Sequence, residues 1–246
     1  MLANETAERT ALVTGASRGI GAGIVRHLLD RGLRVAGTYR SGLENVKKLA
    51  AAYPKHVLPV RLDLARRETA LSAIEEVRQQ WGRLDSLVLN AAVWNGGKLA
   101  KIDPDAWWSV IETNLRSAAA IVRAAIPMLV EGESPSIVLV GSVVGDVGFA
   151  GDTAYASTKA AAVGFARSLA KELAPKGVRV NVLAPGFVDT DMTAAVPDAS
   201  RHKIAAATLL GRFGTVDEIA RAAVFLSEDA TFCTGTVLVA DGGWTL

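Results

Sequence analysis

The chain has 246 residues, 50% of them apolar, and a formal net charge of +2. This composition supports one large hydrophobic core in a single domain, and a charge so near zero gives no electrostatic reason to expect nucleic-acid binding. The only cysteine, Cys233, excludes a disulfide within the chain and fits a reducing, cytoplasmic compartment. We interpret Cys233 as a small buried residue near the last strand.

Residues 1–8 are polar and lack the basic start and apolar block of a signal peptide, so we expect a flexible tail. The most apolar helical stretch, 118–130, contains Arg123 and Pro127, and no uncharged run is long enough to cross a bilayer. The three histidines and the cysteine show no metal-ligand spacing, so we predict no metal site.

From residue 9 onward, short apolar runs alternate with helical patterns. This alternation predicts parallel strands covered by helices on both faces. In such sheets, ligands bind just beyond the carboxyl ends of the strands. The predicted strands are 10–14, 34–39, 57–61, 86–90, 137–141, 178–183 and 235–239.

The first strand runs into a glycine-rich turn, which is followed by a helical pattern over 22–31. Strand, turn and helix in this order are the context of a dinucleotide site, because glycines let the backbone approach a pyrophosphate at a helix N-terminus. A plain tight turn is the alternative. The residues predicted to contact the cofactor here are Gly15, Ser17, Arg18, Gly19, Ile20 and Gly21.

The second strand ends in Thr38-Tyr39-Arg40-Ser41, without the acid that usually binds the ribose hydroxyls of NAD. Arg18 and Arg40 instead favour a 2′-phosphate, and therefore NADP(H). For Arg40 the alternative is a solvated loop charge.

Tyr155 and Lys159 are one helical turn apart, so they share a helix face, and Ser142 lies 13 residues before Tyr155. A neighbouring ammonium lowers the pKa of a phenol, and the serine hydroxyl stabilises charge on a substrate oxygen. The group suits acid–base chemistry on a carbonyl or an alcohol. Each residue also has a structural alternative, such as a serine that simply closes a strand end.

These motifs together resemble the classical short-chain dehydrogenase/reductase family from about Arg9 to the C-terminus. The resemblance implies an α/β fold: a single-domain, Rossmann-type, doubly wound parallel sheet of about seven strands, with residues 9–246 as one NADP-binding catalytic domain. Asn114, Ser142, Tyr155 and Lys159 match the catalytic residues, with Asn114 holding a water that leads to the lysine. Tyr155 and Lys159 are also implied in cofactor binding. The further cofactor contacts that it implies are Asp63, Leu64, Asn90, Ala91, Pro185, Gly186, Val188 and Thr190.

Within the family, 141–145 and 184–192 resemble bacterial 3-oxoacyl-acyl-carrier-protein reductases, which implies NADPH-dependent reduction of a 3-oxoacyl thioester. Two departures stand out. Leu89 and Ala92 replace an Asn and a Gly of the family pattern, for which we expect modest repacking. Glu131 and Glu133 stand where those enzymes often carry bases, and would repel an acidic carrier protein, while Lys171 and Lys176 remain.

The predicted substrate pocket consists mainly of apolar residues, which favour an acyl or cyclic apolar group. Asp152 is the polar member: it either repels an anionic substrate or caps the helix of Tyr155. The segment 190–210 is a candidate lid, because we expect residues 193–200 within it to break regular structure. The pocket residues are Trp94, Val144, Phe149, Asp152, Phe187 and Met192.

Three hypotheses follow. The first is an NADPH-dependent 3-oxoacyl reductase acting on acyl-carrier-protein or coenzyme A thioesters. The second is an NADP-dependent dehydrogenase of a small ketone or secondary alcohol, and the third is a non-catalytic NADP sensor. The small residues 160–164 permit close helix approach, and family members commonly assemble through this helix, so the resemblance implies a homotetramer.

Overall fold

The computed structural model describes residues 8–246, so almost all of the predicted flexible tail lies outside the described residues. Within this range, seven strands form one parallel sheet in the order β3-β2-β1-β4-β5-β6-β7. The predicted α/β class and doubly wound sheet are confirmed. The strands are β1 (Thr10–Val13), β2 (Arg34–Tyr39), β3 (Val57–Arg61), β4 (Ser86–Leu89), β5 (Ser136–Val140), β6 (Arg179–Pro185) and β7 (Val237–Ala240).

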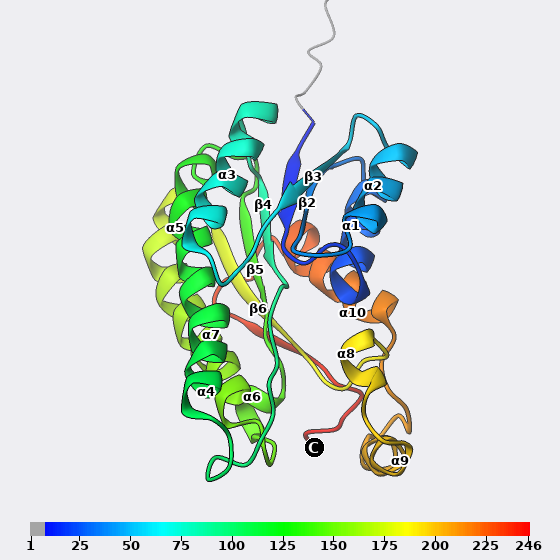
Figure 1. The fold of residues 1–246 in the computed structure, drawn as a ribbon. Helices are drawn as coiled ribbons and strands as arrows, with labels where there is room; N and C mark the ends of the chain where they lie inside the picture. Colours follow the sequence, from blue (N-terminus) through cyan, green and yellow to red (C-terminus); the bar gives the residue numbers. More distant parts are fainter. Residues whose placement is uncertain (1–7) are drawn as a thin grey trace, which may run out of the picture.

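Helices cover both faces of the sheet (Figure 1). One layer contains α3 (Arg67–Trp81), α5 (Ser117–Leu129) and α7 (Thr153–Leu173). The other contains α1 (Gly19–Asp30), α2 (Leu43–Ala52) and α10 (Val216–Val224). Each layer encloses its own core of buried aliphatic side chains against the sheet. This two-sided burial explains why the strands read as continuous apolar runs.

Shorter elements gather around the carboxyl ends of the strands or join the long helices (Figure 1). Two are single π-helical turns inside longer helical stretches. Such turns are rare and often occur at functional sites. The elements are α4 (Pro104–Ile111), the π-turn η1 (Glu112–Arg116), α6 (Val144–Val147), the 3₁₀ turn η2 (Ala174–Lys176), α8 (Asp191–Ala194), α9 (Asp198–Ala207) and the π-turn η3 (Phe225–Asp229).

The sequence predicted that all seven strands exist, but it did not place all of their first and last residues correctly. The last strand begins at Val237 rather than at 235, because Gly235 has a φ of 72°, outside the extended region. The sixth strand runs on to Pro185, whose carbonyl accepts a hydrogen bond from the Val143 amide at 3.0 Å.

The prediction that 193–200 breaks regular structure is correct at 195–197, while α8 extends to Ala194 and α9 begins at Asp198. Thr190 and Thr193 form a reciprocal capping box that starts α8, and Pro197 precedes α9. Only the connection around 195–197 interrupts the helices.

Two further expectations concern burial. Cys233 is only partly buried, and its carbonyl accepts a hydrogen bond from the Asn181 amide group at 2.8 Å. The apolar stretch at 118–130 forms α5, with Pro127 inside the helix. Across residues 8–246, no helix combines the length and the apolar character that a membrane crossing requires.

The order of the sheet also locates its ligand-binding edge. The chain builds outward from β1 to β3 on one side, then returns to the centre and builds outward from β4 to β7 on the other. The connections after β1 and β4 therefore diverge, and they leave a crevice at the carboxyl ends of these two strands.

Candidate active site

The glycine-rich turn follows β1 and leads into α1. Gly15 and Gly19 have φ values of 71° and 54°, which side-chain-bearing residues rarely adopt. A Cβ atom on Gly21 would lie 2.2 Å from the Gly15 carbonyl oxygen and 2.6 Å from the Asn90 amide nitrogen. The turn therefore has this shape only because a hydrogen atom stands at position 21.

Thr14 and Asn90 join this turn to the end of β4. The Asn90 side chain donates to the Thr14 carbonyl at 2.9 Å, and the Thr14 hydroxyl accepts the amides of Asn90 and Ala91, each at 2.9 Å. Thr14 is almost fully buried, with 1% of its surface exposed. Our list of site residues from the sequence did not include Thr14. The sequence signal that could have identified Thr14 is a polar residue at the end of a buried strand.

Thr38 at the end of β2 holds the other side of the turn and was also missed. Its hydroxyl accepts the Gly15 amide at 3.1 Å, and its carbonyl accepts the Ala16 amide at 2.8 Å. At the start of α1, Arg18 occupies the N-cap position without a side-chain cap. The first amides of α1 thus remain available to an anion, as a pyrophosphate site requires.

The two predicted phosphate-binding arginines lie on neighbouring segments. Asn45, just after Arg40, donates its side-chain amide to the Ser17 carbonyl at 3.1 Å, which holds the two turns side by side. Arg18 makes an exposed ion pair with Asp191 at 3.4 Å, and Arg40 is exposed. We call the turn at 15–21 the glycine cradle. Together with the uncapped start of α1 and the two arginines, it forms a donor set that fits NADP(H).

Asp63 and Leu64 follow β3. The Asp63 carboxylate accepts the Ala65 amide at 3.1 Å, and its backbone amide donates to the Thr69 hydroxyl at 3.1 Å. These bonds shape the turn into α3. The contact of this pair with adenine stays a prediction.

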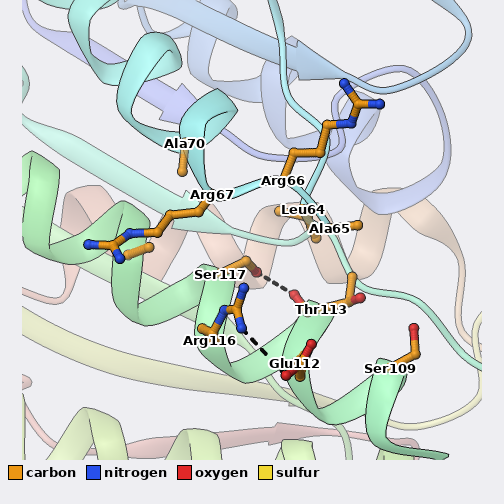
Figure 2. Close-up of a pocket in the computed structure, with 11 residues that line it drawn as sticks. Leu64, Ala65, Arg66, Arg67, Ala70, Ser109, Glu112, Thr113, Arg116 and Ser117 are labelled. Atoms are coloured by element: carbon orange, nitrogen blue, oxygen red, sulfur yellow. Dashed lines mark hydrogen bonds and ion pairs between the residues drawn. The ribbon is translucent and has the colours of Figure 1, made fainter. Parts of the chain in front are cut away.

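Leu64 also lines a small cavity of about 80 Å³ between the start of α3 and the π-turn η1 (Figure 2). Glu112 and Arg116 form an ion pair at 3.4 Å on its lower wall, where the Ser117 hydroxyl donates to the Thr113 carbonyl. None of the Ser142, Tyr155 and Lys159 side chains lines this cavity, so it is not the catalytic pocket.

The Tyr155 and Lys159 side chains lie together on α7, as the four-residue spacing predicts. The Lys159 ammonium nitrogen is 5.3 Å from the centroid of the Tyr155 ring, and it donates to the Val140 carbonyl at 2.7 Å. Ser142 follows β5 by two residues, and its hydroxyl accepts the Val144 amide at 3.2 Å. The lysine thus links the helix to the strand end that carries the serine.

Burial controls the acidity of both groups. It raises the pKa of Tyr155 to about 12, with a smaller contribution from the Asp152 carboxylate, and it lowers the pKa of Lys159 to about 8. The net shift of the Tyr155 pKa is upward, opposite to the lowered value that the sequence predicted, because burial and the Asp152 carboxylate both disfavour the phenolate. At neutral pH the phenol is protonated and can donate.

Asn114 lies in the π-turn η1. Its amide exchanges two hydrogen bonds with the backbone of Val93, both at 2.8 Å. Its nitrogen also lies 3.4 Å from the Thr158 hydroxyl, one residue before Lys159. Asn114 thereby holds the loop that follows Asn90 against α7. Its role in positioning a water stays a prediction.

The residues predicted to form the substrate wall surround the N-terminus of α7. Asp152 is the N-cap residue by position, but its carboxylate makes no capping bond and instead accepts the Trp94 indole N–H at 2.9 Å. The helix-capping alternative is therefore wrong. Trp107 donates similarly to the Thr153 hydroxyl at 3.0 Å, and so anchors α4 to the start of α7.

On the opposite side, Phe149 and Phe187 belong to an aromatic cluster. Their ring centroids are 5.9 Å apart, and Phe187 also lies 5.6 Å from Phe213 and 5.3 Å from Trp244. No local sequence signal pointed to Phe213 and Trp244, because they come from distant segments. Of the other predicted wall residues, Val144 is buried, while Met192 on α8 is 50% exposed.

The loop after β6 carries the remaining predicted cofactor contacts. A Cβ atom on Gly186 would lie 2.7 Å from that of Asp241, and the Gly186 amide donates to the Ala240 carbonyl at 3.0 Å. Val188 is buried and forms an isolated bridge with Gly214. These contacts hold the loop against the C-terminal segment, with Thr190 opening α8.

In the part of the chain that the structure describes, no three His, Cys, Asp or Glu side chains are grouped as metal ligands.

Comparison with known proteins gives a consistent relationship. A family model described as enoyl-(acyl carrier protein) reductase matches residues 15–245. The 3-oxoacyl-acyl-carrier-protein reductases of Salmonella typhimurium and Escherichia coli K12 are 41% and 40% identical over 238 residues, 96% of this chain and 96% of each relative. The chain belongs to the short-chain dehydrogenase/reductase family. This confirms the resemblance seen in the sequence.

A solved relative extends the match to three dimensions. The blue fluorescent protein from a metagenomic library, crystallised with NADPH, superposes with a TM-score of 0.90 at 33% identity. The match covers 97% of this chain and 98% of that chain. Of the two replacements beside Asn90, Leu89 is buried in the core, and Asn90 still bonds to the turn.

The glycine cradle gives a direct test. Gly21→Ala places a methyl group against the Gly15 carbonyl and the anchored Asn90 amide, so we expect the free energy of unfolding to fall by about 1–3 kcal/mol. NADPH affinity should fall as well, which titration calorimetry measures beside denaturant unfolding. Gly214→Ala is the matched control, because its nearest atoms are at 3.7 Å. Unchanged stability and affinity in Gly21→Ala would contradict the cradle.

Proposed function

We propose that this protein uses NADPH to reduce 3-oxoacyl thioesters to 3-hydroxyacyl thioesters. The observation that carries the proposal is the position of Tyr155 and Lys159 beside the end of β5, at the same edge of the sheet as the glycine cradle. The near full-length similarity to 3-oxoacyl reductases supports the substrate class, and the solved relative that holds NADPH supports the cofactor.

When bound, NADPH supplies a hydride to the carbonyl carbon. Tyr155 donates its phenolic proton to the carbonyl oxygen, and Ser142 donates a hydrogen bond to the same oxygen. Lys159, with a pKa of about 8, holds a proton at neutral pH that can replace the one lost from the phenol. We also assign to Lys159 the binding of the nicotinamide ribose, and to Asn114 the water that connects this lysine to solvent.

The remaining cofactor contacts follow from position. The uncapped start of α1 receives the pyrophosphate beside Ser17, Gly19 and Ile20. Asp63, Leu64, Asn90 and Ala91 surround the adenosine side. The loop from Pro185 through Gly186 and Val188 to Thr190 faces the nicotinamide. Arg18 and Arg40 bind the 2′-phosphate.

The surface residues proposed to receive the acyl carrier differ from the family pattern. Glu131 and Glu133 are exposed, and the Glu133 carboxylate lies 3.6 Å from Arg83, which offsets part of its charge. Lys171 and Lys176 are exposed and can receive an acidic acyl carrier protein. The two glutamates favour the alternative of a free ketone, so the substrates must be compared directly.

The activity prediction is tested by loss of NADPH absorbance with acetoacetyl-acyl-carrier-protein, acetoacetyl-coenzyme A and a panel of simple ketones. We expect thioester turnover in the wild type and none in Tyr155→Phe, which removes the proton donor but leaves NADPH binding intact. Ketone turnover without thioester turnover would support the small-molecule alternative. NADPH binding without any turnover would support the sensor, and turnover by Tyr155→Phe would contradict the assigned donor.

The cofactor preference is tested by Arg40→Asp. Losing a charge-assisted contact to the 2′-phosphate should raise the KM for NADPH by roughly 10- to 100-fold and favour NADH. Arg26→Asp makes the same charge change on an exposed position of α1 and should leave the ratio unchanged. If Arg40→Asp has the same preference for NADPH over NADH as the wild type, Arg40 is only a solvated surface charge.

We further propose a homotetramer. The edge strand β7 pairs only with β6, and Val239 on it is 51% exposed. Phe232 and Leu246 nearby in sequence are almost fully exposed, and a second copy would bury such surfaces. We expect light scattering to give the mass of four chains, and Phe232→Glu to lower it. A wild-type monomer would contradict this assembly.

A further inference from the structure

Asp152 and Trp94 form a bridge across the approach to Tyr155. Trp94 lies four residues after Asn90, while Asp152 begins the helix that carries Tyr155. Their hydrogen bond is 2.9 Å long, and a second bond, from the Gly97 amide to the Gly151 carbonyl at 2.7 Å, runs beside it. Two links therefore hold the same pair of segments at a fixed separation.

The bridge keeps a carboxylate in an unusual place. Asp152 is partly buried, and desolvation raises its pKa. Within residues 8–246, the Trp94 N–H is the only hydrogen-bond partner of this side chain. A half-covered carboxylate costs free energy that a serine or an alanine would not. Neither capping nor an ion pair explains it.

The Asp152 carboxylate acts electrostatically on Tyr155, the proposed proton donor. The carboxylate raises the pKa of Tyr155 in addition to the larger effect of burial. Lys159 is the other charged group beside the ring, at 5.3 Å from its centroid. Asp152 stands at the start of α7, three residues before Tyr155, so a negative charge on the substrate close to its carbonyl would meet the same repulsion.

We propose that the Trp94–Asp152 bridge selects substrates by their charge. It excludes 3-oxo acids whose carboxylate is free and admits those whose carboxyl group is esterified or thioesterified. In a free 3-oxo acid only one methylene separates the carboxylate from the carbonyl that Tyr155 protonates. In a thioester the same position is neutral. The inference rests on the proposed carbonyl reduction and adds the reason why the site would require an acyl carrier.

Acetoacetate and ethyl acetoacetate are the matched substrates, because they differ in this one charge. We expect Asp152→Asn to raise kcat/KM for acetoacetate by roughly tenfold relative to ethyl acetoacetate. Asp152→Glu, which restores the carboxylate, should retain the exclusion. Asp146→Asn is the control, because its carboxylate is close in sequence but exposed on α6. Trp94→Phe keeps the ring and removes the donor, so the exclusion should weaken.

Binding of acetoacetate to the protein–NADP⁺ complex, measured by calorimetry, gives a readout that needs no turnover. Its Kd should fall by roughly tenfold in Asp152→Asn relative to the Kd of ethyl acetoacetate. If acetoacetate binds no more tightly to Asp152→Asn than to the wild type, the charge selection is overturned. If the expected binding change occurs but neither ester nor thioester is reduced, the proposed function fails and the charge selection stands.

Discussion

The contact between the glycine turn and Asn90 is the constraint on which the site depends. At the point where the sheet changes direction, β1 and β4 deliver two turns into the same small space. Asn90 bonds to the Thr14 carbonyl, and Gly21 leaves no Cβ atom in the way. With this contact in place, α1 starts at a fixed position, and its first amides face the crevice. Any side chain at 21 would force the turns apart.

The second half of the site is built on α7, and its electrostatics favour one direction of proton transfer. Burial raises the pKa of the phenol and lowers that of the lysine, so the proton is held more firmly on Tyr155 and less firmly on Lys159 than in water. The Val140 carbonyl accepts from the ammonium and fixes its position. A protonated phenol beside a labile ammonium suits reduction, in which the protein must give up a proton.

The segment from Asn90 to Ile111 connects these two halves. Trp94 and Trp107 donate to Asp152 and Thr153 at the start of α7, and Asn114, just beyond the segment, bonds to Val93 within it. These bonds place the cofactor side and the proton donor in one rigid frame. They also explain why polar and aromatic residues from separate parts of the sequence lie together at the start of α7. Relatives at 36–41% identity over 96% of the chain carry the same overall plan.

The sequence alone determined the class of the fold, the seven strands, the glycine turn and the pairing of Tyr155 with Lys159, because each depends on local spacing or on burial patterns that repeat every few residues. It did not determine where β6 and β7 begin and end, the two helices within 190–210, or the partners of Asp152, which depend on pairing and packing between distant segments. Thr38, Phe213 and Trp244 reach the site only through the folded chain. The pKa of Tyr155 was also decided by tertiary structure, since the sequence shows the neighbouring Lys159 but not the burial that disfavours the phenolate.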